Sequence, residues 1–99
     1  MAIGSFRNRA TEDINYGRRT KAALRLLLSD LHEKAQVKLA RLSAATSLGD
    51  LRSLPGNRFE ALKGERRGQY SIRVNDQFRI CFRWENYQSE AVEIVDYHR

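Results

Sequence analysis

The hydrophobic period of the chain changes after residue 58, and this change limits the folds open to it. Before that point, apolar residues recur at helical spacing and form one stripe: Leu31, Ala35, Leu39 and Leu42. Beyond it, apolar and polar residues alternate in the runs Tyr70–Val74, Phe78–Trp84 and 91–97. Alternation with period two is typical of half-buried strands. The sequence therefore predicts an α+β fold in which N-terminal helices pack on a small antiparallel sheet.

The length and charge of the chain narrow its organisation and its partners. Its 99 residues suffice for one hydrophobic core, so we expect a single domain over residues 1–99. Lys and Arg number 18 against 12 Asp and Glu, which gives a net charge of +6. This balance favours an anionic partner, such as nucleic acid, the ribosome surface, an acidic protein or an anionic membrane, without choosing among them.

Cysteine content and apolar runs exclude several classes of protein. Cys81 is the only cysteine in the sequence, which excludes a disulfide framework and a cysteine-based zinc site. The apolar run over residues 22–28 is interrupted by Arg25, is too short to span a membrane and lacks the pattern of a secretory signal. We therefore expect a cytoplasmic protein with no metal site and no membrane partner.

The N-terminal third of the sequence predicts short elements. Ile3 and Phe6 are the apolar residues of a candidate edge strand over residues 1–6. Thr11 is the expected N-cap of a short helix that extends to Tyr16. For residues 18–28, the apolar pattern does not decide between helix and strand.

A longer amphipathic helix is expected over residues 31–45. Asp30 can cap it, with Glu33 three residues later as the partner in a capping box. Three basic residues lie along one flank of its apolar stripe: Lys34, Lys38 and Arg41. This flank is either a solvated face beside the core or a surface for RNA or protein contact, and the sequence leaves both open. A connecting loop is expected over residues 46–58, with a turn at 54–57.

The register of the predicted hairpin follows from its apolar face. A two-residue loop at 75–76 would mix apolar and charged residues on both faces. A three-residue loop, 75–77, keeps one face apolar by pairing Val74 with Phe78, Ile72 with Ile80, and Tyr70 with Phe82. The other face then carries Ser71 opposite Cys81 and Arg73 opposite Arg79.

The opposition of Arg73 and Arg79 is the unusual feature of this hairpin. Like charges opposite each other on a sheet cost a few tenths to about 1 kcal/mol, and a surface that tolerates this cost usually holds an anion. Alternatively, the two arginines splay apart or pair with carboxylates such as Glu93 or Asp96. Further basic residues lie just before the hairpin and would extend the same surface: Lys63, Arg66 and Arg67.

The last residues of the chain include Asp96-Tyr97-His98. Together they offer a proton donor or acceptor, a phenol and an imidazole. On a strand, Asp96 and His98 would point to one side and Tyr97 to the other. By spacing alone, such a tripeptide at a terminus is more often plain surface than a catalytic site.

The chain nevertheless resembles a known family over most of its length. Residues 55–84, the ending 92–98 and parts of 38–46 resemble the HigB toxins of the RelE superfamily. The resemblance covers residues 30–98 well and the first 29 residues loosely. Its most specific motifs are Leu62-Lys63-Gly64, Tyr70-Ser71-Ile72-Arg73, Arg79-Ile80-Cys81-Phe82 and Asp96-Tyr97-His98.

The resemblance implies a bacterial toxin of a type II toxin–antitoxin module. Such toxins are ribosome-dependent endoribonucleases that cleave mRNA without a metal or another cofactor. The ribose 2′-OH attacks the adjacent phosphate, which requires a base, an acid and cations around the phosphorane. The implied partners are the ribosome, mRNA and an antitoxin with a helix-turn-helix domain, and operator DNA would be bound only through the antitoxin complex.

The resemblance also assigns residues. By motif, the catalytic set is Lys63, Arg79, Asp96, Tyr97 and His98. Asp96 or His98 would move protons, and Tyr97 would orient the substrate or stack on a base. Lys63 and Arg79 would neutralise the phosphate in the transition state. The residues expected to hold RNA are Arg66, Arg73, Lys34 and Lys38.

One departure affects the expected activity. Some members carry histidine and proline where this chain has Glu60 and Ala61. If that histidine transfers a proton, Glu60 replaces it here or His98 acts alone. The alternative function is a non-cleaving module of the same fold that binds RNA, the ribosome or a protein. A DNA-binding protein in its own right is less favoured, because no helix-turn-helix pattern is evident.

Overall fold

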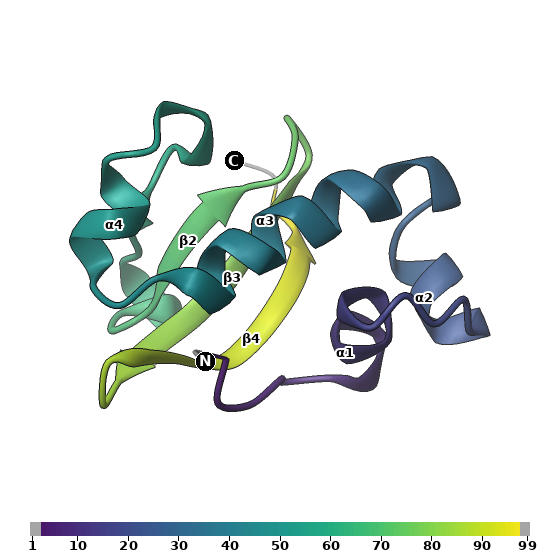
Figure 1. The fold of residues 1–99 in the computed structure, drawn as a ribbon, viewed down its shortest axis with the longest axis horizontal. Helices are drawn as coiled ribbons and strands as arrows, with labels where there is room; N and C mark the ends of the chain where they lie inside the picture. The colour runs from purple at the N-terminus through teal and green to yellow at the C-terminus, as the bar shows by residue number, and fades with distance from the viewer. Residues whose placement is uncertain (1–2, 98–99) are drawn as a thin grey trace.

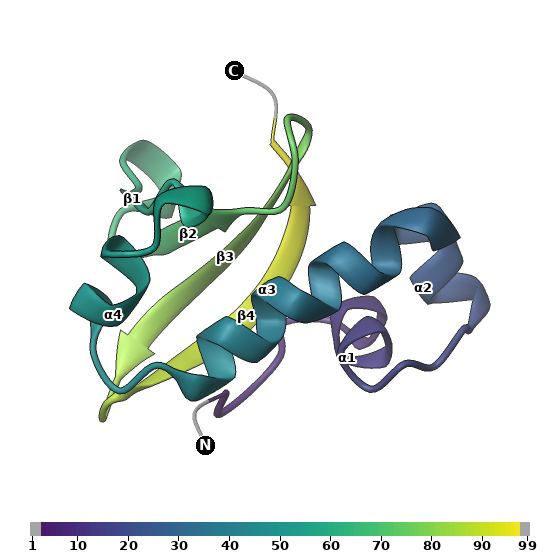
Figure 2. The same cartoon turned by 45° about the horizontal axis from the view of Figure 1, so that its top comes forward.

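Helix α3 (His32–Ala44) crosses one face of a curved antiparallel sheet in the computed structural model, which describes residues 3–97 (Figure 1). Helices α1 (Arg9–Asn15) and α2 (Lys21–Leu26) lie beside one end of α3, and α4 (Leu48–Arg52) lies near its other end (Figure 2). Within the described residues the sheet has the order β1-β2-β3-β4. Its strands are β1 (Glu60–Ala61), β2 (Tyr70–Arg73), β3 (Phe78–Glu85) and β4 (Gln88–Asp96). The predicted α+β class is confirmed.

Short 3-10 turns connect these elements: η1 (Ser29–Leu31), η2 (Pro55–Asn57) and η3 (Gly64–Arg66). The turn η2 falls on the predicted turn at 54–57, where Pro55 supplies a fixed φ. Among residues 3–97, no helix has the length and apolar character needed to cross a membrane.

The predicted hairpin register is confirmed in every pair. Between β2 and β3 the partners are Tyr70 with Phe82, Ser71 with Cys81, Ile72 with Ile80, and Arg73 with Arg79. Beyond the ladder, the amide of Val74 donates to the carbonyl of Phe78 at 2.9 Å. The side-chain oxygen of Asn75 accepts from the amides of Gln77 and Phe78 at 2.9 and 2.7 Å, which closes the three-residue loop.

The hydrophobic core lies between α3 and the apolar face of the sheet. Ala35, Leu39 and Leu42 of the predicted stripe are buried, and Leu31 packs at the margin. They face buried sheet residues that include Ile72, Ile80, Phe82, Val92 and Ile94. Each large apolar side chain buried in this way contributes about 1.5–3 kcal/mol. This packing fixes which sheet face remains for chemistry.

Two predicted helix starts are wrong. The N-cap of α1 is Asn8, whose side-chain oxygen accepts from the amide of Thr11 at 2.8 Å. Thr11 is buried instead, and its hydroxyl accepts from the amide of Ile94 at 3.0 Å. Asp30 lies in η1, and no side chain caps α3, so the capping box is absent. The Thr11 hydroxyl is taken up by a tertiary contact while Asn8 caps α1, and a tight turn holds Asp30 away from the start of α3.

Other differences concern lengths. The undecided segment over residues 18–28 contains α2, capped by Thr20, and the expected loop over 46–58 contains α4, capped by Ser47. Strand β4 begins at Gln88, three residues before the start of the predicted run over 91–97. The turn before it needs only Asn86 and Tyr87, both with left-handed backbone (φ 52° and 64°). Of the candidate N-terminal strand, Ile3 and Phe6 form single parallel bridges with β4, and residues 1–2 lie outside the described part.

Candidate active site

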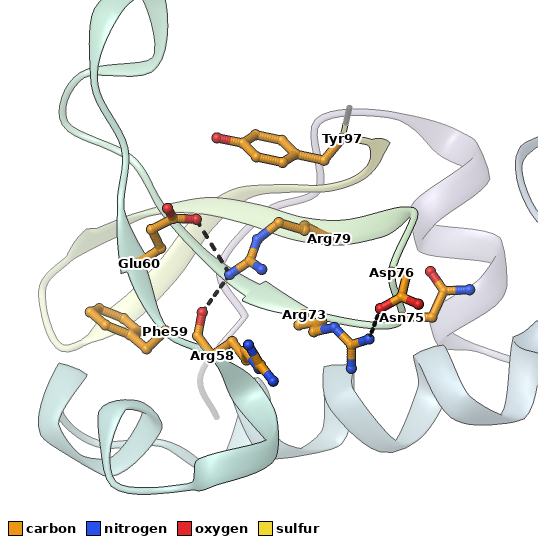
Figure 3. Close-up of a pocket in the computed structure, with 8 residues that line it drawn as sticks. All are labelled: Arg58, Phe59, Glu60, Arg73, Asn75, Asp76, Arg79 and Tyr97. Atoms are coloured by element: carbon orange, nitrogen blue, oxygen red, sulfur yellow. Dashed lines mark hydrogen bonds and ion pairs between the residues drawn. The ribbon is translucent and has the colours of Figure 1, made fainter. Parts of the chain in front are cut away.

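The sheet face away from the core carries Ser71, Arg73, Arg79 and Cys81, and we call it the arginine face. A pocket of about 650 Å³ opens on it, between the segment leading into β1, the hairpin and the chain after β4 (Figure 3). Pockets that hold small ligands have volumes of about 300–1,000 Å³. The lining residues are Arg58, Phe59, Glu60, Arg73, Asn75, Asp76, Arg79 and Tyr97.

Arg79 lies at the centre of this pocket and is held from several sides. Its Nε donates to the hydroxyl of Ser71 at 2.7 Å, and a terminal nitrogen donates to the carbonyl of Arg58 at 2.5 Å. The same nitrogen lies 3.8 Å from a carboxylate oxygen of Glu60 (Figure 3). The Arg79 side chain is only 11% exposed, so its charge is fixed in place and weakly screened.

Arg73 reaches the same pocket from β2 and forms an ion pair with Asp76 in the hairpin loop (Figure 3). Asp76 is 99% exposed, so this pair contributes little to stability. The two opposed arginines thus have separate carboxylates, Asp76 and Glu60, while Glu93 pairs with Arg66 at 3.1 Å. The carboxylates named from the sequence were therefore not the ones that the fold places beside Arg73 and Arg79.

Tyr97 and Asp96 are placed on opposite sides of the sheet, as the strand pattern predicted. The ring of Tyr97 lies over the guanidinium of Arg79, with 5.8 Å between the ring centre and the guanidinium carbon. The carboxylate of Asp96 accepts from the side-chain amide of Gln77 at 3.0 Å and lines a different hollow, beside α2. His98 lies outside the described residues.

Comparison with known proteins places this arrangement in a family. Residues 15–98 match the family described as the RelE-like toxin of the type II toxin–antitoxin system HigB. The chain belongs to the HigB-like toxin family. The sequence motifs indicated a good resemblance only over residues 30–98. The family match begins at residue 15 and so also includes α2 and the last residue of α1.

Two relatives and one solved structure are similar to this chain. Toxin HigB-1 of Vibrio cholerae serotype O1 is 48% identical over 60 residues, which are 61% of this chain and 63% of that protein. An uncharacterized protein of Haemophilus influenzae is 41% identical over 58 residues, 59% of this chain and 57% of that protein. The chain thus spans less than two thirds of each relative. A chain of the YoeB–YefM complex from Staphylococcus aureus shares the fold, with a TM-score of 0.54, 18% identity and coverage of 100% and 98%.

Lys63, which matches a HigB motif, and Arg66, an expected RNA contact, lie outside this pocket lining. Lys63 is exposed and precedes η3, and Gly64 after it has left-handed backbone (φ 65°), which suits the Leu-Lys-Gly motif. Arg66 donates to Gln69 at 3.0 Å and to Glu93 at 3.1 Å. Lys63, Arg66 and Asp96 do not line the pocket that holds Arg79, and their assigned roles stay predictions.

The basic flank of α3 divides into two kinds of residue. Lys34 is exposed, whereas Lys38 is only 7% exposed and donates to the carbonyl of Gly56 at 2.8 Å. Burial, reinforced by the nearby charges of Arg41, Lys34 and Arg73, lowers the pKa of Lys38. The ammonium of Lys38 is engaged with the loop, and these contacts compete with the RNA contact expected of it.

Glu60 lines the pocket although it is not among the catalytic residues predicted from the HigB motifs. Strand β1 pairs Glu60 with Ser71, which puts its side chain on the arginine face beside Arg79. A strand of two residues gives no alternating pattern, so period alone could not place it. Cys81 lies on the same face but is fully buried, and burial raises the pKa of its thiol, as expected of an inert cysteine.

Proposed function

We propose that this chain is the toxin of a type II toxin–antitoxin module and acts as a ribosome-dependent endoribonuclease on translated mRNA. The observation that carries the proposal is the convergence of Arg73 and Arg79 with a carboxylate and a phenol in one pocket. Two cations suit a phosphate that gains charge, and a carboxylate suits proton transfer. Membership of the HigB-like family supports the same reaction class.

In this proposal the substrate supplies its own nucleophile. The ribose 2′-OH attacks the adjacent phosphorus, the bond to the 5′ oxygen breaks, and the products are a 2′,3′-cyclic phosphate and a 5′-OH. Arg79 neutralises the charge that develops on the phosphorane oxygens, because its guanidinium is held and weakly screened. Arg73 would bind the same phosphate or its neighbour after leaving Asp76.

The pocket offers Glu60 as the group that accepts the proton from the 2′-OH, since it lies beside Arg79. The leaving 5′ oxygen takes a proton from a donor, for which His98 is the expected residue by motif. The ring of Tyr97, at the wall of the pocket, would stack on a base and turn the ribose toward Glu60. Lys63, Asp96 and Arg66 remain expected contributors by resemblance, and Lys34 remains an expected RNA contact.

Primer extension on mRNA from cells briefly induced for the protein tests this function. We expect cuts within translated codons that disappear in Arg79→Gln and in His98→Ala. An exposed arginine on α2, Arg25, gives a control of equal charge change, and Arg25→Gln should cut as the unaltered chain does. Growth arrest with intact mRNA would contradict the proposal and favour the non-cleaving binding module.

The partner in this proposal is an antitoxin that carries a helix-turn-helix domain and links the pair to operator DNA. The family description names a toxin–antitoxin system, and the protein of like fold was solved in a YoeB–YefM complex. Co-purification with the protein encoded beside it, followed by an operator shift assay with and without the toxin, tests this partner. Operator binding by the isolated chain would contradict it.

A further inference from the structure

Asn57 is a fully buried polar residue whose side-chain nitrogen and oxygen are both hydrogen-bonded. Its amide nitrogen donates to the carbonyl of Leu51 at 3.1 Å. Its side-chain oxygen accepts from the ammonium of Lys38 and from the guanidinium of Arg41, each at 3.3 Å. With the bond from Lys38 to Gly56, these contacts tie η2 to α3. We call the group of Lys38, Asn57 and Gly56 the loop lock.

The residue after the loop lock has an unusual backbone. Arg58 has left-handed backbone (φ 45°, ψ 54°), which residues other than glycine seldom adopt and which costs about 1–2 kcal/mol. A conformation of this kind persists where its surroundings hold it. The loop lock lies immediately before Arg58 and ties the turn that precedes it to α3.

The consequence of this backbone is found in the pocket. The carbonyl of Arg58 accepts from a terminal nitrogen of Arg79 (Figure 3). The hydroxyl of Ser71 accepts from its Nε. Two acceptors at different nitrogens fix both the place and the plane of a guanidinium. Without the Arg58 carbonyl, this terminal nitrogen would rely on the longer contacts to the Ser71 carbonyl at 3.4 Å and to the Glu60 carboxylate at 3.8 Å, so the plane of Arg79 would be held less firmly.

We propose that Lys38 on α3 and Asn57 in η2 are positioning residues for Arg79, acting through the carbonyl of Arg58. Neither reaches the pocket itself. The effect on activity rests on the function proposed above, whereas the effect on the orientation of Arg79 does not.

The chemistry of the loop lock supports this role over simple packing. Lys38 carries a charge in a buried position, which costs desolvation free energy that an apolar side chain would avoid. What an apolar side chain cannot supply is donors for the carbonyl of Gly56 and the side chain of Asn57. Burial accordingly lowers the pKa of Lys38.

The test compares Lys38→Met with Lys21→Met, which removes an equal charge from an exposed position on α2. The first readout is the NMR correlation of the Arg79 Nε–H group, assigned by its loss in Arg79→Lys. We expect Lys38→Met to shift this signal and Lys21→Met to leave it in place. The second readout is ribosome-dependent cleavage, where we expect kcat to fall about tenfold or more with KM within about twofold, because misplaced groups lose rate rather than binding.

Several outcomes would overturn this inference. An unmoved Arg79 signal in folded Lys38→Met excludes positioning. A rise in KM with unchanged kcat would show instead that Lys38 contacts RNA. If the unaltered chain does not cleave, the proposed function fails, and the Arg79 signal still decides the positioning role. Should Lys38→Met fail to unfold cooperatively, Asn57→Ala removes the acceptor that Lys38 and Arg41 share, and an Arg79 signal that stays unmoved there would likewise exclude the role.

Discussion

Asp96 and Tyr97 are neighbours in the chain but lie on opposite sides of the sheet, and only Tyr97 lines the pocket that holds Arg79. Asp96 extends toward Gln77 and the hollow beside α2. Asp96 and Tyr97 therefore do not share one pocket, and the residues of the C-terminal motif must be tested separately.

The first prediction concerns the carboxylate that moves the proton. Because Glu60 lies beside Arg79 and Asp96 does not line the pocket, Glu60→Gln should lower kcat more than Asp96→Asn does. Loss of a general base typically costs about a hundredfold or more. Single-turnover cleavage on purified ribosomes measures both, and Glu65→Gln is a matched control at an exposed position in η3. A larger loss in Asp96→Asn would return the proton transfer to the C-terminal motif.

A second prediction tests the ring of Tyr97. If the ring stacks on a base, Tyr97→Phe keeps most of the cleavage rate, while Tyr97→Ala loses about 1–3 kcal/mol of stabilisation, which is about 5- to 150-fold in kcat/KM. Equal losses in the two variants would show that the hydroxyl, not the ring, acts. Kinetics with a short mRNA programmed in the A site provide the measurement.

Asp76 gives a third prediction, because its carboxylate occupies the place that a phosphate would take on Arg73. Asp76→Asn should tighten binding of a non-cleavable 2′-O-methyl RNA, by at most about fivefold, since an exposed ion pair is worth about 1 kcal/mol or less. The salt dependence should steepen by about 0.7 in log–log slope, as one phosphate contact is gained.

The control for Asp76 is Glu85→Gln, which breaks the comparable surface pair with Arg83 at 3.3 Å, outside the pocket lining. That variant should bind RNA as the unaltered chain does. A similar gain in both variants would mean that net charge alone, and not release of Arg73, raises the affinity.

The fourth prediction concerns stability at low pH. The pKa of Asp13 lies below its usual value of 3.8, chiefly because Thr20 donates to it at 2.8 Å, with Arg18 and Arg9 as nearby cations. A lowered carboxyl pKa stabilises the fold above the unfolded value and loses this effect as pH falls through the folded pKa. The free energy of unfolding should therefore drop on acidification below about pH 4.

Urea unfolding at several pH values checks this. Asp13→Asn should be less stable than the unaltered chain at pH 7, with a gap that narrows toward pH 2. Glu12→Gln, which removes the neighbouring carboxylate on the same helix, serves as the control. A gap that stays constant with pH would show that packing, and not the charge of Asp13, carries its contribution.

The sequence decided the sheet because its information there is local. Period two, one continuous apolar face and a three-residue loop leave a single register, so Arg73 had to lie opposite Arg79. The same alternation put Asp96 and Tyr97 on different sides. The start of α1 was predicted wrongly, because both Asn8 and Thr11 are suitable N-cap residues. The hydroxyl of Thr11 instead accepts from a backbone amide of β4, and Asn8 caps the helix.

What the sequence by itself determined was the α+β class, the hairpin register and the pairing of two arginines on one face. Only the tertiary structure decided that Glu60 and the carbonyl of Arg58 lie beside Arg79, and that Lys38 turns inward to Gly56. These contacts join segments 18 or more residues apart. No local period encodes such a distance, because it depends on how α3, η2 and the sheet pack around a shared core.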